Sequence, residues 1–99
     1  MAKTVQLRRY EIVPGRLEEF RGWLNKEVLP IRKQFGFQVE FMYLDNANSE
    51  FIWAVSVPGS VEDFIAVENA YDASVERKLA GEKRPDCLVS VDTKFVDEN

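Results

Sequence analysis

Histidine is absent from this chain of 99 residues. Histidine is the usual general base near neutral pH, the usual activator of Ser and Cys nucleophiles and the commonest metal ligand. Its absence excludes histidine-based catalytic triads and histidine-based metal sites. Any acid–base chemistry would therefore fall to carboxylates, Tyr, Lys or Cys side chains.

Cysteine occurs once, at Cys87. A single Cys excludes an intrachain disulfide and a zinc site built on cysteine pairs. Because the chain has neither His nor paired Cys, we expect no metal, no haem and no other cofactor. Without a His to activate its thiol, we interpret Cys87 as a small buried apolar residue rather than as a reactive one.

Long apolar runs and clusters of positive charge are also missing. The longest apolar run, "FIWAV" at residues 51–55, is too short to cross a bilayer, and the first residues lack the apolar core of a secretory signal. The net charge is -4, the pI is about 4.8, and the Lys and Arg residues are scattered. We therefore expect a soluble, cytoplasmic protein that binds neither membranes nor nucleic acid.

Apolar residues make up 45% of the chain and aromatic residues 12%, which is enough for a packed core. A chain of this length does not support two separate cores. We therefore expect one domain over residues 1–99.

The hydrophobic pattern predicts four strands and two helical regions. Apolar residues that recur at steps of three or four predict a helix over residues 17–35, disturbed at Pro30 and ended at Gly36. Ser60, with Asp63 three residues later, predicts the start of the second helical region, which breaks and restarts with Asp72 or Ser74 as the new cap. Residues that alternate between apolar and polar predict strands over residues 4–12, 37–44, 51–57 and 87–96.

The resulting order, βαββαβ, is typical of a ferredoxin-like α+β fold, in which both helical regions cover one face of an antiparallel four-stranded sheet. The third strand is apolar on both faces, since Phe51, Trp53 and Val55 alternate with Ile52 and Ala54. Strands of this kind are normally buried on both sides. Because the chain has no residues left to cover the second face, we expect a second subunit to cover it in a homodimer.

Three passages of the sequence resemble the NIPSNAP family of the dimeric α+β barrel superfamily. They are "LRRYEIVPGRLEEF" at residues 7–20, "VLPIRKQFGF" at residues 28–37 and "EFIWAVSV" at residues 50–57. The resemblance extends over roughly residues 5–96. It implies that two sheets pack face to face across a two-fold axis and enclose a pocket, but it does not imply an activity. Relatives in the superfamily include cofactor-independent monooxygenases, a haem-degrading branch and stabilising proteins. The superfamily's enzymes commonly use His in the pocket, and this chain has none.

Arg8 and Tyr10 are the first candidates for a ligand site, because they share a strand face with Ile12. On one interpretation they point into the barrel, where the guanidinium can bind a carboxylate or a carbonyl group. On the alternative interpretation Arg8 pairs with Asp92 or Glu40, and Tyr10 lies in the dimer interface.

Trp53 and Asp92 complete the candidate set. Trp53 can stack on a flat ligand, although Trp53 and Trp23 are more simply interpreted as core or interface residues. A carboxylate in a dry pocket can act as an acid or a base, which makes Asp92 a candidate. Glu40 lies on the expected edge strand, where we interpret its charge as structural. The sequence does not identify a catalytic residue or a metal site.

Three functions are compatible with these residues. The favoured hypothesis is a homodimeric protein that binds an apolar or aromatic small molecule bearing a carboxylate or carbonyl group. The second is an enzyme, a cofactor-independent monooxygenase or an isomerase acting on an aromatic or polyketide-like compound. The third is a structural module that dimerises or stabilises. The sequence does not decide whether the protein is an enzyme.

Overall fold

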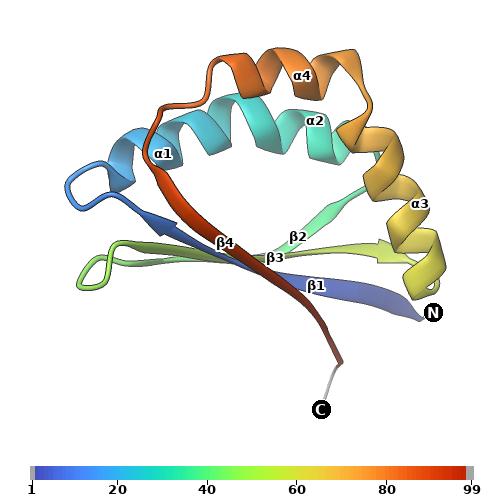
Figure 1. Cartoon of the computed structure of the whole chain (residues 1–99). Coiled ribbons are helices and arrows are strands. Elements are labelled where there is room, and N and C mark those ends of the chain that lie inside the picture. The colour runs from blue at the N-terminus through green and yellow to red at the C-terminus, as the bar shows by residue number, and fades with distance from the viewer. Residues whose placement is uncertain (1, 98–99) are drawn as a thin grey trace.

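The structure, a computed structural model, describes residues 2–97. Within this range four strands form one antiparallel sheet in the order β2-β3-β1-β4, and the helices lie on one side of it (Figure 1). The strands are β1 (Lys3–Ile12), β2 (Gln38–Asp45), β3 (Glu50–Pro58) and β4 (Leu88–Val96). The predicted ferredoxin-like arrangement is confirmed. No helix in the described part of the chain is long and apolar enough to cross a membrane.

The first helical region is a rod with a wide turn in its middle. It consists of α1 (Leu17–Trp23), a π-helical turn (Leu24–Val28) and α2 (Leu29–Gln34). Pro30 has no N–H to donate to the carbonyl of Lys26, so the turn before it is free to widen, and the N–H of Leu29 donates to the carbonyl of Leu24. The predicted disturbance at Pro30 thus takes the form of one extra residue in the turn that precedes it.

The second helical region consists of α3 (Val61–Asp72) and α4 (Val75–Glu82). Ser60 and Asp63 form a reciprocal capping box at the start of α3, and the Ser74 hydroxyl accepts the N–H of Arg77 at the start of α4. The predicted capping box is confirmed, and of the two predicted caps for the restart, Asp72 and Ser74, the structure uses Ser74. The break at Ser74 lets α4 turn back and lie beside the α1–α2 rod, while α3 descends toward the end of the sheet (Figure 1).

The strand register decides which side chains lie between the sheet and the helices. Arg8 of β1 is opposite Trp53 of β3 and opposite Thr93 of β4, so these side chains share the helix-facing side. The core lies on that side, and Trp53 and Phe64 within it are 0% exposed. The other side of the sheet has no helix over it and is called the open face below.

A register shift in β2 corrects one prediction, which came from the alternation of apolar and polar residues in this strand. That pattern places Val39 and Phe41 on the same face, but the structure places Val39 on the helix-facing side and Phe41 on the open face. Glu40 is the extra residue of the bulge between them. Its carboxylate accepts hydrogen bonds on the open face from Ser56 (2.7 Å) and Lys3 (2.9 Å), which confirms its structural role.

Candidate functional site

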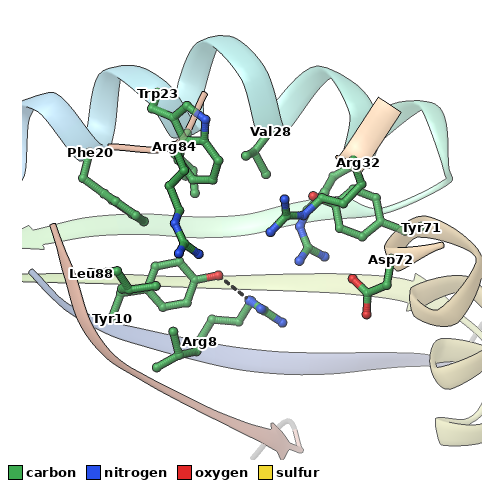
Figure 2. Close-up of a pocket in the computed structure, with 13 residues that line it drawn as sticks. Arg8, Tyr10, Phe20, Trp23, Val28, Arg32, Tyr71, Asp72, Arg84 and Leu88 are labelled. Carbon is green, nitrogen blue, oxygen red and sulfur yellow. Dashed lines mark hydrogen bonds between the residues drawn. The ribbon is translucent and has the colours of Figure 1, made fainter. Parts of the chain in front are cut away.

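A cavity of about 100 Å³ lies between the sheet and the helix layer. Strands β1 and β4 form its floor, the α1–α2 rod forms its roof, and the C-terminal end of α3 closes one end (Figure 2). Its apolar wall is made by Phe20, Trp23, Leu24, Val28 and Leu88. The indole N–H of Trp23 is directed away, to the carbonyl of Ala80 at 2.8 Å, so the ring presents apolar surface to the cavity.

Arg8 and Tyr10 lie side by side on the floor. The Nε of Arg8 donates to the hydroxyl oxygen of Tyr10 at 2.8 Å, as the dashed line in Figure 2 shows. The Nη1 of Arg8 donates to Gln6 and also to Glu68 of α3, at 3.1 Å. Burial works to lower the pKa of Arg8, but Tyr10 and then Glu68 raise it by more, so the guanidinium stays charged.

Arg32 of α2 enters the cavity from the roof and is only 3% exposed. Its guanidinium carbon lies 4.4 Å from the ring centre of Tyr71, 4.8 Å from that of Phe37 and 5.3 Å from that of Trp53. Its Nη2 is 3.8 Å from a carboxylate oxygen of Glu68. Its Nε and Nη1 have no hydrogen-bond partner within residues 2–97. Burial, and next the charge of Arg8, lower the pKa of Arg32.

Tyr71 closes the end of the cavity beside Arg32 (Figure 2). The residue is 0% exposed, and its hydroxyl is buried without a hydrogen-bond partner among the described residues. Burial raises the pKa of Tyr71, partly offset by the charge of Arg32. The phenol is therefore protonated at neutral pH, and it can donate a hydrogen bond.

The rim of the cavity carries further charges. Arg77 of α4 and Arg84, which follows α4, line it together with Asp72 at the end of α3. Among the described residues the lining thus contains the arginines Arg8, Arg32, Arg77 and Arg84 but only one carboxylate. The chain as a whole carries a net charge of -4. The positive charge is therefore a property of this cavity and not of the protein's composition.

The structure brings together only part of the predicted site. Arg8 and Tyr10 line the cavity, and Trp53 lies beside them at 0% exposure, as a core residue. Asp92 is on the open face, opposite Arg9, so it does not line this cavity. Side chains alternate between the two sides of a strand, and in the strand register Asp92 lies opposite Arg9 rather than opposite Arg8.

Three further expectations about Arg8 and Tyr10 are corrected. Their side chains lie between the sheet and the helices of one subunit, not on the open face that would form the interior of a barrel. Arg8 pairs with Glu68 and with neither Asp92 nor Glu40. Tyr10 is 7% exposed within the subunit, so it does not anchor an interface.

No pattern in the sequence predicted Arg32, Tyr71 or Glu68 as site residues. The apolar periodicity of the first helix places Ile31 on the inner face, whereas the structure buries Arg32 and leaves Ile31 half-buried. The π-helical turn adds one residue and so moves the inner face by one position. Pro30 within the periodic segment was the only local signal of such a shift.

The remaining candidate side chains have structural roles. Cys87 is 1% exposed, which confirms its interpretation as a small buried residue, and burial raises the pKa of its thiol. Within residues 2–97 no cluster of carboxylate, His or Cys side chains could hold a metal ion. The chemistry available in the cavity is therefore that of guanidinium groups, phenols and an apolar wall. Such groups can bind and orient an anion, and a phenol can also transfer a proton.

Comparison with known proteins identifies the fold. No family model matches the chain, and no curated protein matches it in sequence. An uncharacterized NIPSNAP domain protein from Burkholderia xenovorans superimposes with a TM-score of 0.86 at 15% identity, covering 97% of this chain and 94% of that one. A NIPSNAP family protein from Agrobacterium tumefaciens gives 0.87 at 13% identity, covering 99% and 94%.

A more distant neighbour is a putative antibiotic biosynthesis monooxygenase from Bacteroides thetaiotaomicron. Its TM-score is 0.64 at 19% identity, and the match covers 98% of this chain and 88% of that one. At such low identities the similarity shows a shared architecture. The resemblance that the sequence passages indicate is confirmed at this level: the chain has the fold of the NIPSNAP domain proteins.

Proposed function

We propose that this chain is a NIPSNAP-type protein that binds a small molecule in the cavity between the sheet and the helices. The observation that carries the proposal is the set of buried polar groups that share one cavity with an apolar wall. Arg8, Tyr10 and Arg32 converge there from β1 and α2. A cavity that combines an apolar wall with a few convergent polar groups is typical of a ligand site. A purely structural module has no need of it.

The ligand that suits this cavity combines an apolar or aromatic body with a carboxylate or carbonyl group. The apolar body packs against the wall formed by residues such as Phe20 and Trp23. The polar group accepts hydrogen bonds from Arg8 and from Tyr10. Because the hydroxyl oxygen of Tyr10 already accepts the Nε–H of Arg8, its own proton is available to donate to the ligand.

Native mass spectrometry of protein purified from its own host, compared with the denatured mass, tests the proposal. We expect an extra small mass on the native protein. The variant Leu88→Trp, which fills the cavity from β4, should lose that mass. The matched variant Val89→Trp places the same ring one residue away, at a position that is 55% exposed, and should keep it. A native protein without added mass, or loss in both variants, would contradict the cavity site.

We also propose that two subunits pair through their open faces. Phe41 and Tyr43 on this face are 37% and 67% exposed, and their rings lie 5.6 Å apart. Leu7 and Ile52 are half-buried beside them without a covering helix. An exposed apolar patch of this kind, bordered by charges such as Lys94, is typical of an interface between subunits.

A second candidate function is an enzyme that uses Tyr10 for proton transfer. The observation that favours it is again the bond from Arg8, which orients the phenol toward the cavity. If the protein turns over an aromatic or polyketide-like compound, Tyr10→Phe should remove the turnover and retain binding. Equal turnover by Tyr10→Phe and wild type would exclude Tyr10 as the proton donor.

A further inference from the structure

The deep end of the cavity holds a guanidinium that the protein only partly satisfies. Arg32 is 3% exposed, and two of its three nitrogens lack a hydrogen-bond partner within residues 2–97. A buried charge without a full set of hydrogen bonds is destabilising, so proteins retain such a group chiefly where it has a task. The hydroxyl of Tyr71, beside it, is likewise buried without a partner in the described part of the chain.

The charges at this end do not balance. Arg8 and Arg32 contribute two positive charges, and the charge of Arg8, after burial, lowers the pKa of Arg32. Glu68 is the carboxylate that reaches both, at 3.1 Å from Arg8 and at 3.8 Å from Arg32. Asp72 and Arg77, which line the cavity beside Tyr71, add one charge of each sign and cancel. Among the described residues at this end, one positive charge is therefore left over. A neutral ligand would leave this charge unpaired, and a ligand with two negative charges would exceed it.

The surroundings favour a planar anion with a small ring. Guanidinium groups bind carboxylates through paired, coplanar hydrogen bonds, and Arg32 is held among aromatic rings that fix its plane. The cavity measures about 100 Å³. In another protein a cavity of about 150 Å³ holds one benzene ring. This cavity is smaller, so it has room for at most one ring, and it opens at the rim.

We infer that the ligand is a monoanion, an organic carboxylate with an apolar body of about one ring, which compensates the surplus charge of Arg32. In this inference Glu68 determines which ligand charge is preferred. Its single negative charge neutralises one of the two guanidinium groups, so the ligand must supply one negative charge for the other. Arg77 and Arg84 at the rim attract the anion toward the cavity. The inference rests on the proposed function, since it assigns a ligand class to the same cavity.

The test compares three ligands of similar shape and different charge. Benzoate has one negative charge, benzamide has none, and phenylphosphonate has two at mildly alkaline pH. Binding is followed on ¹⁵N-labelled full-length protein through the Nε–H resonance of Arg32, which reports contact with this group directly. We expect benzoate to bind about tenfold or more tightly than either of the others and to shift this resonance.

Two variants separate charge from shape. Arg32→Met keeps an unbranched side chain in the aromatic cage but removes the charge, and it should abolish the preference for benzoate over benzamide. Glu68→Gln keeps the side-chain shape and adds one net positive charge to the site. It should raise the affinity for phenylphosphonate relative to benzoate by about tenfold. Circular dichroism of both variants checks that the fold is retained.

The outcomes distinguish this inference from the proposed function. If benzamide binds the cavity as tightly as benzoate, the cavity is a ligand site but the charge inference is wrong. If Glu68→Gln leaves the ratio of phenylphosphonate to benzoate affinity unchanged, Glu68 does not set the charge. If none of the three probes perturbs residues of the cavity at millimolar concentration, both the inference and the cavity site are contradicted.

Discussion

Arg8 and Tyr10, two residues apart on β1, are joined by a hydrogen bond of 2.8 Å from the Nε of the guanidinium to the phenol oxygen. Residues at this spacing point to the same side of a strand, so the contact needs no other element to form. The bond fixes the plane of the guanidinium and leaves the phenol proton free. This pair is built from a single strand.

Tyr10→Phe should lower the free energy of unfolding by about 1–2 kcal/mol, because a part-buried hydrogen bond to a charged donor is lost. Denaturant titration measures the change. Tyr43→Phe is the matched control, since Tyr43 is 67% exposed on the open face, and its effect should stay within about 0.5 kcal/mol. Equal effects of the two variants would show that the bond to Arg8 contributes nothing.

Arg32→Met should leave the free energy of unfolding unchanged or raise it by about 1 kcal/mol. The reason is that Arg32 is buried with two nitrogens that lack hydrogen bonds in the described part of the chain, and an apolar side chain of similar length avoids that cost. Chemical denaturation followed by tryptophan fluorescence measures the change.

Arg8→Met provides the contrast with Arg32→Met. Arg8 donates to Tyr10, Gln6 and Glu68, so its removal should destabilise the fold by about 3 kcal/mol. A loss of similar size in Arg32→Met would show that Arg32 is retained for stability. A ligand would then not be needed to explain why Arg32 is buried.

Tyr43→Glu should convert a dimer into monomers, because it places a charge within the apolar part of the open face. Size-exclusion chromatography with light scattering measures the mass. Val75→Glu on α4 is the control, since Val75 has a nearly equal exposure of 68% on a different part of the surface. A wild-type protein that is already monomeric would refute pairing through the open face.

Glu40→Gln should destabilise the fold at neutral pH but not in acid. The Ser56 hydroxyl and then the Lys3 ammonium lower the pKa of Glu40 below its ordinary value of 4.5. The stabilisation is therefore complete above the unfolded pKa and is lost as the pH falls through the lower folded value.

Urea midpoints at pH 7 and at about pH 3 test this prediction. The difference between wild type and Glu40→Gln should be present at the first pH and should shrink at the second. Glu76→Gln, at an exposed position on α4, controls for the change in net charge. A difference that does not depend on pH would contradict the role of the Glu40 carboxylate.

The predictable part of the fold rests on interactions between near neighbours in the sequence. The caps at Ser60 and Ser74 each join residues that lie three positions apart. The alternation of side chains along β1 correctly predicted that Arg8 and Tyr10 lie on the same face, because these residues are only two positions apart. The bulge at Glu40 was missed, because an extra residue in one strand is visible only against the partner strand.

The sequence by itself determined the order of the elements, the capping box at Ser60 and the shared strand face of Arg8 and Tyr10, since each depends on spacing along a short segment. Only the tertiary structure decided the rest of the site. The π-helical turn moved Arg32 into the inner face, and the packing of α3 on the sheet brought Glu68 to Arg8, sixty positions away. Contacts between distant segments depend on how whole elements pack, and neither composition nor periodicity specifies that packing.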